Sequence, residues 1–281
     1  MKTVRKVETK VVNGVSGNMR QTRLISSDLL GRSKEALVRG LIWAFIGTLY
    51  GLLFAFFLVL SDGWKHQINP YFFSGVLAGT IGALIYSSMR LAVLMAVIIT
   101  PIASLVLLFT NVPMNPLPLI LTIGLVGGVI GGLYGHYSRV SRVYRADAKT
   151  LAGFCAGFLV SLSYLVMADQ NQDVALIWII GFMCPLTGWV YVMLVPTFIK
   201  YFDNLLPVEG DGALVGIGVS VFISLMVLVM TNSINTNSAG TYLPQIEVIQ
   251  ALIPQAVAGG LLGGGVAGLI SGLLFKNWQD L

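Results

Sequence analysis

The chain has 281 residues, of which 56% are hydrophobic and only 10% are charged, and its mean hydropathy is +0.84. Because soluble domains carry roughly 25% charged residues, this composition excludes an ordinary water-soluble globular protein. The formal net charge is +5. The basic residues gather at the ends of apolar stretches, so the charge is explained by membrane topology rather than by nucleic-acid binding.

The chain opens with a polar and basic segment, residues 1–38, which contains no apolar stretch typical of a cleaved signal peptide. We expect a cytoplasmic tail, in which residues 26–39 form an amphipathic lead-in helix that lies on anionic lipid headgroups. An organellar transit peptide is the alternative interpretation. Glu8, Asp28 and Glu35 are unusual in such peptides, so a bacterial inner membrane is preferred.

Long uncharged stretches follow the tail, and a helix needs about 20 such residues to cross the hydrocarbon core. The stretch between Arg90 and Arg139 is long enough for two crossings, and the Asn and Pro residues at positions 111–118 predict a turn in its middle. The fold class is therefore an all-α polytopic membrane protein with eight transmembrane helices. They are expected at residues 40–61, 71–88, 91–110, 119–137, 150–168, 175–196, 213–231 and 251–275.

The distribution of basic residues predicts the orientation. If residue 1 lies inside, all but one of the 17 lysines and arginines fall on the cytoplasmic side, and the exception is Lys65. Both termini are then cytoplasmic. The segment 198–213 falls on the same side, and Pro207, Gly210 and Gly212 predict that it is a turn rather than a helix.

The predicted helices form two successive sets that resemble each other. Residues 58–62 (LVLSD) resemble residues 165–169 (LVMAD), and residues 107–111 (LLFTN) resemble residues 228–232 (LVMTN). We predict a duplication of a four-helix unit, with parallel repeats at residues 39–138 and 150–276. A basic cytoplasmic linker at 139–149 joins the repeats, and a short cytoplasmic tail at 277–281 follows them.

Glycines recur every four residues in the fourth and eighth predicted helices. Examples are Gly124, Gly128 and Gly132 in the former and Gly260 and Gly264 in the latter. This spacing is typical of a glycine zipper, in which missing side chains let two helix backbones approach closely. We expect these two helices to meet between the repeats, either as a packing face or as the wall of a passage.

Prolines interrupt several predicted helices, and each removes a backbone hydrogen bond. The freed carbonyl groups could line a solute path together with nearby polar side chains, or neighbouring Ser and Thr hydroxyls could satisfy them at an ordinary kink. Tyr86 and Tyr191 are further polar groups that could line such a path, although their positions favour interface or buried contacts. The predicted path consists of Thr100, Pro101, Pro185, Thr187 and Gln255.

No ionisable residue falls near the middle of a predicted helix, which disfavours ion-coupled pumping. The chain also has no nucleotide-binding loop, nucleophile elbow or metalloprotease motif, so we predict no catalytic activity, cofactor or metal. Cys184 precedes Pro185, as in helices that transport soft metals, but a single thiol does not make a metal site.

Two function classes remain. The first is a membrane channel or permease component for a small solute that does not pump ions. The alternative is a non-catalytic integral membrane subunit that anchors or assembles a larger complex. The expected partners are the lipid bilayer, anionic headgroups at the basic tail, and other proteins or further copies of the chain, without nucleic acid.

Overall fold

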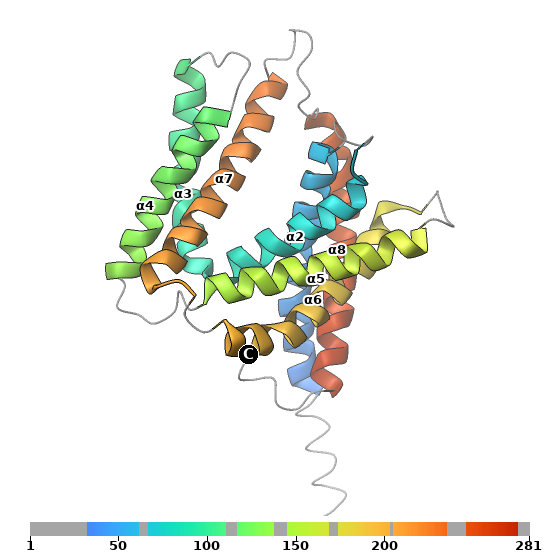
Figure 1. Ribbon diagram of the computed structural model, residues 1–281. Coiled ribbons are helices and arrows are strands. Elements are labelled where there is room, and N and C mark those ends of the chain that lie inside the picture. Colours follow the sequence, from blue (N-terminus) through green and yellow to red (C-terminus); the bar gives the residue numbers. More distant parts are fainter. Residues whose placement is uncertain are drawn as a thin grey trace, which may run out of the picture.

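The computed structural model describes residues 33–61, 67–110, 117–137, 145–168, 174–202, 205–234 and 246–274. Within these residues all regular structure is helical, and eight helices are long and apolar enough to cross a membrane. The chain is therefore an integral, multi-pass membrane protein. The helices are an unlabelled first helix at Ser33–Ser61, then α2 (Pro70–Ser87), α3 (Met89–Thr110), α4 (Leu117–Tyr137), α5 (Ala146–Ala168), α6 (Leu176–Tyr201), α7 (Val208–Ile234) and α8 (Ile246–Leu274) (Figure 1).

Local chemistry sets several helix ends. Pro70 occupies the start of α2, where no backbone N–H is needed, and the Asn69 side chain accepts hydrogen bonds from the N–H groups of Tyr71 and Phe72 at 3.0 and 3.2 Å. A single residue, Ser88, breaks the helix between α2 and α3. Arg145 adopts a positive φ of 62° immediately before α5 begins.

The eight predicted helices are all present, but some of their ends differ from the expectation. The predicted turn at residues 198–213 is too long: α6 continues to Tyr201 and α7 already begins at Val208, so the chain is non-helical only in part of that segment, which includes Pro207. The sequence predicts that Gly212 is a turn residue, yet it lies in the first turns of α7 and packs directly on Gly131 of α4. Its small size serves helix packing rather than chain reversal. Residues 1–32, which hold most of the predicted tail and the first half of the predicted lead-in helix, lie outside the described residues, and the first helix already begins at Ser33.

The helices form two groups (Figure 1). In one group α7 packs along both α3 and α4. In the other, α8 packs along α6 and along the first helix, while α2 and α5 pack on each other and α5 also packs on α6. Buried side chains divide in the same way, since Phe54 and Met183 lie in one core and Met95 and Val215 in the other. Contacts between the groups are fewer and involve mainly α2 and α5 against α7.

Glycines bring three antiparallel helix pairs into backbone contact. A methyl group at Gly131 of α4 would collide with the carbonyl oxygen of Gly212 in α7, and one at Gly260 of α8 would collide with that of Gly47 in the first helix. Between α2 and α5, a Cβ atom added at Gly79 would lie 2.9 Å from the Gly153 carbonyl oxygen. Apolar burial does not drive association in lipid, so such close approaches supply packing energy.

The predicted contact between the fourth and eighth helices is wrong. The glycine face of α4 packs on α7, and that of α8 packs on the first helix. A row of glycines indicates a close neighbour, but the identity of that neighbour depends on a matching row of small residues in another helix. Each of the three close pairs joins a helix from 39–138 to one from 150–276. The two predicted repeats therefore interlock, and the duplication itself stays a prediction.

Candidate functional site

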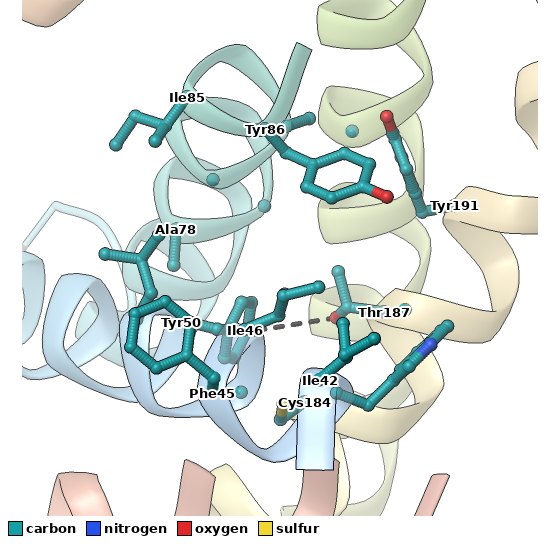
Figure 2. Close-up of a pocket in the computed structure, with 18 of the residues that line it drawn as sticks. Ile42, Phe45, Ile46, Tyr50, Ala78, Ile85, Tyr86, Cys184, Thr187 and Tyr191 are labelled. Atoms are coloured by element: carbon teal, nitrogen blue, oxygen red, sulfur yellow. Dashed lines mark hydrogen bonds between the residues drawn. The ribbon is translucent and has the colours of Figure 1, made fainter. Parts of the chain in front are cut away.

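A cavity of about 510 Å³ lies between the first helix, α2, α5 and α6. It is walled mainly by side chains of the first helix, α2 and α6, and Gly153 is the contribution of α5. The residues that form its rim, its walls and its polar ends include Leu41, Phe45, Tyr50, Ala78, Gly82, Tyr86, Met89, Cys184, Thr187 and Tyr191, and most of them are labelled in Figure 2.

The cavity exists because α2 contributes small residues where it passes the first helix. A Cβ atom added at Gly82 would meet only the Leu53 side chain, at 3.8 Å, so open space remains beside this glycine. Gly79, one turn earlier, is different because it packs against the α5 backbone. Ala78 and Ala83 are also small and buried. The wall of α2 therefore lacks the large side chains that would fill the space.

The polar side-chain groups of the cavity are hydroxyls, the Cys184 thiol and the Trp43 indole N–H. At one end, the Tyr50 hydroxyl and the Thr187 hydroxyl lie 3.4 Å apart and satisfy each other. At the other end, the Tyr86 hydroxyl is directed towards Tyr191 (Figure 2). The Tyr191 hydroxyl is buried and has no hydrogen-bond partner among the described residues. One end of the cavity thus has its hydrogen bonds made, and the other end has a polar atom without a partner.

The cavity opens on an apolar rim. Leu41 and Phe45 of the first helix are 69% and 65% exposed, and Met89 is 50% exposed. Tyr50, Thr187 and Cys184 at the inner end are buried. No residue that lines the cavity carries a charge. The rim of the cavity is therefore apolar, and its inner end is enclosed.

The structure does not bring the predicted path residues together. Thr187 lines the cavity. Pro185 lies one turn away and packs against Gly263 of α8. Thr100 and Pro101 are exposed on α3, and Gln255 is exposed on α8. Pro101, Pro185 and Pro254 do lie inside helices, as the sequence predicts.

The sequence does not predict Tyr50 or Gly82 as part of a solute path, and it leaves Tyr86 and Tyr191 open between a path and ordinary interface or buried contacts. A possible signal is the spacing of Ala78, Gly79, Gly82 and Ala83 along one helix, which thins the wall of α2. This signal cannot be separated from a packing face without knowing which helix lies opposite. The two cysteines are free, and no group of metal-ligand side chains forms among the residues that the structure describes.

A second polar cluster lies where α4, α5 and α7 meet. The Asp211 carboxylate, 6% exposed, accepts hydrogen bonds from the backbone N–H groups of Arg145 (2.8 Å) and Asp147 (3.2 Å) at the start of α5. Asp147 in turn accepts one from the N–H of Leu206. Asp211 therefore caps α5 from a different helix. This cluster ties the two helix groups together.

No protein family, curated protein or solved structure matches this chain. The cavity and the placement of charge are therefore the features that bear on function.

Proposed function

We propose that the chain is a membrane channel or permease component that moves a small uncharged solute and does not pump ions. The observation that carries this proposal is the cavity of about 510 Å³ between four helices, which no charged side chain lines. Small-molecule sites commonly have volumes of roughly 300–1,000 Å³, and bundles of transmembrane helices commonly build them between helices. The cavity residues Thr187 and Tyr50 supply hydroxyls rather than charges.

The placement of charge supports transport without ion coupling. Within the described part of the chain, charged residues lie near the helix ends, as Arg90, Lys149, Lys200 and Asp211 do. Proton- and sodium-driven transporters instead carry acidic or basic groups at mid-membrane depth, where the coupling ion binds. We therefore propose passive movement of the solute, and we propose a bacterial inner membrane as the location.

We further propose that both chain ends face the cytoplasm. The support is the asymmetry of basic residues, because Lys65 is the only one of 17 on the other side of the proposed membrane. A cysteine placed at Gln67 should therefore react with a membrane-impermeant maleimide in intact cells. A cysteine at Leu205, an exposed residue between α6 and α7, should react only after lysis.

Both labelling variants should be built on a chain in which Cys155 and Cys184 are replaced by alanine. Reaction of the Leu205 cysteine in intact cells, with protection of the Gln67 cysteine, would reverse the proposed orientation. Reaction of both would show that the two sites share the outer side and would overturn the assignment of the helices between them.

The transport proposal is tested by reconstituting the purified chain into liposomes. We expect small neutral solutes to cross faster than in empty liposomes, and we expect anions and sodium to cross no faster. The physical reason is that an ion in an uncharged cavity lacks the partners that offset its desolvation. Measurement of solute-driven swelling by light scattering, beside ion-sensitive dyes, separates the two classes.

The same experiment decides between the proposed function and its alternative. Absence of any flux, together with loss of a large native membrane assembly when the gene is deleted, would identify a non-catalytic subunit that anchors a complex. In that case, deletion of residues 1–32, which lie outside the described residues, would test whether partners bind at the basic tail. Flux of ions equal to that of neutral solutes would contradict the uncharged cavity as the route.

A further inference from the structure

We propose that the cavity binds a neutral amphiphile, a molecule with one hydrocarbon segment and one hydrogen-bonding group, which reaches it sideways from the lipid. This inference goes beyond the proposed function, because it concerns a second kind of ligand that reaches the same cavity from the lipid. Its experiment measures binding rather than flux, so the two proposals can fail separately.

The rim of the cavity determines the route by which a ligand arrives. Leu41 and Phe45 project from the first helix with most of their surface exposed, and Met89 does so from the start of α3. A hydrated polar solute gains nothing from crossing such a rim, whereas a hydrocarbon chain passes from lipid to cavity at little cost because both surroundings are apolar. The rim therefore selects molecules that are already dissolved in the membrane.

The unpaired hydroxyl at one end determines where the polar group of the ligand binds. The Tyr191 hydroxyl is buried without a partner among the described residues, which leaves a polar group desolvated at a cost of about 1–3 kcal/mol. Tyr86, which also lines this end, points its hydroxyl towards the Tyr191 side chain (Figure 2). An alcohol, carbonyl or amide oxygen on a ligand would pair with the Tyr86 phenol, and with the enclosed Tyr191 phenol where the side chains around it move aside; both phenols can donate and accept.

The opposite end of the cavity receives the hydrocarbon segment. Tyr50 and Thr187 already bond to each other there, so this end competes less for a polar group, and Ala78 and Cys184 beside them are buried. A cation or carboxylate in the cavity would face no counter-charge, because none of the lining residues is charged. The chemistry of the lining thus favours a neutral head and excludes a fatty acid anion.

The experiment uses the full-length chain in nanodiscs and a photoactivatable fatty alcohol that carries a diazirine in its chain. We expect ultraviolet irradiation to label peptides of the first helix, α2 and α6, and we expect an unlabelled fatty alcohol to compete. Gly82→Phe fills the cavity, because open space surrounds this glycine, and should reduce labelling by about tenfold or more. Gly265→Phe is the matched control, since Gly265 also has only a side chain near it, Ala44 at 3.7 Å, but does not line the cavity.

Tyr191→Phe and Tyr86→Phe test the polar end without changing the shape of the cavity. Each should weaken competition by the unlabelled alcohol about fivefold, as expected for one lost hydrogen bond. Equal labelling of the wild type and Gly82→Phe would overturn the inference, as would equally strong competition by the matched fatty acid. Specific labelling with no solute flux would support the inference and remove the transport proposal. Specific labelling together with solute flux that Gly82→Phe does not alter would support the inference and show that the solute crosses by another route.

Discussion

Replacing Gly131 by alanine will destabilise the protein by about 2–3 kcal/mol, whereas the same change at the adjacent Gly132 will not destabilise it. A methyl group at Gly131 collides with the backbone carbonyl of Gly212, and a backbone cannot move aside as a side chain can, so α4 and α7 must separate. At Gly132 the nearest atoms are the Glu209 carbonyl oxygen at 3.5 Å and the Ala213 methyl at 3.8 Å, which is ordinary contact.

Helix propensity makes this comparison sharper. Alanine favours an isolated helix over glycine by about 1 kcal/mol, so propensity alone predicts that both variants are stabilised. Unfolding by SDS in mixed micelles, followed by circular dichroism, measures the difference. Gly264→Ala and Gly265→Ala form the second matched pair. The added methyl group collides with the Trp43 carbonyl oxygen at Gly264, whereas at Gly265 it makes only ordinary contact with Ala44. Equal stability within both pairs would show that the close backbone contacts do not hold the helices together.

The positions of the helices could be predicted because the membrane imposes a length and a composition on every crossing. Uncharged stretches bounded by residues such as Arg39 and Lys149 are enough to find the helices without any knowledge of their neighbours. The ends near α6 and α7 could not be predicted in the same way. Gly210 and Gly212 are typical of turns, yet they lie in the first turns of α7, which packs on α4.

The partners of the glycine faces could not be predicted, because a glycine row carries no information about what lies opposite. Gly212 and Gly216 of α7 meet Gly131 and Gly127 of α4. The sequence offers α8 as an equally good partner for α4 by spacing alone. Which rows meet depends on the order in which the helices surround one another, and this is a property of the whole assembly.

The cavity could be predicted only in part for a related reason. Thr187 was identified because it lies beside a helix-breaking proline, and it does line the cavity. Thr100 and Gln255 carry the same polar signal but face outward. A cavity is a space left by several helices, so the residues that create it are small ones such as Gly82. Such residues have no reactive or ligand-binding side chain, so a search of the sequence for functional groups does not find them.

Replacing Asp211 by alanine will cost about 2 kcal/mol of unfolding free energy, because it leaves backbone N–H groups of Arg145 and Asp147 without an acceptor at a buried helix start. The loss also loosens the junction between the two helix groups, since Asp211 belongs to α7 and the groups that it caps belong to α5. Asp211→Asn retains one acceptor oxygen and should lose about half as much. Thermal unfolding in detergent, followed by fluorescence, ranks the three proteins.

The control for this prediction is Glu209→Gln, two residues earlier in the same helix. Glu209 also contacts a group on another helix, Nδ1 of His136 at 3.1 Å, but both side chains are more than half exposed. Water competes for such a pair, so its removal should leave the stability unchanged within error. Equal stability of Asp211→Ala and Glu209→Gln would show that the buried carboxylate does not cap α5. A stable Asp211→Ala variant with increased solute flux would instead show that the junction restrains movement of the two helix groups rather than their folding.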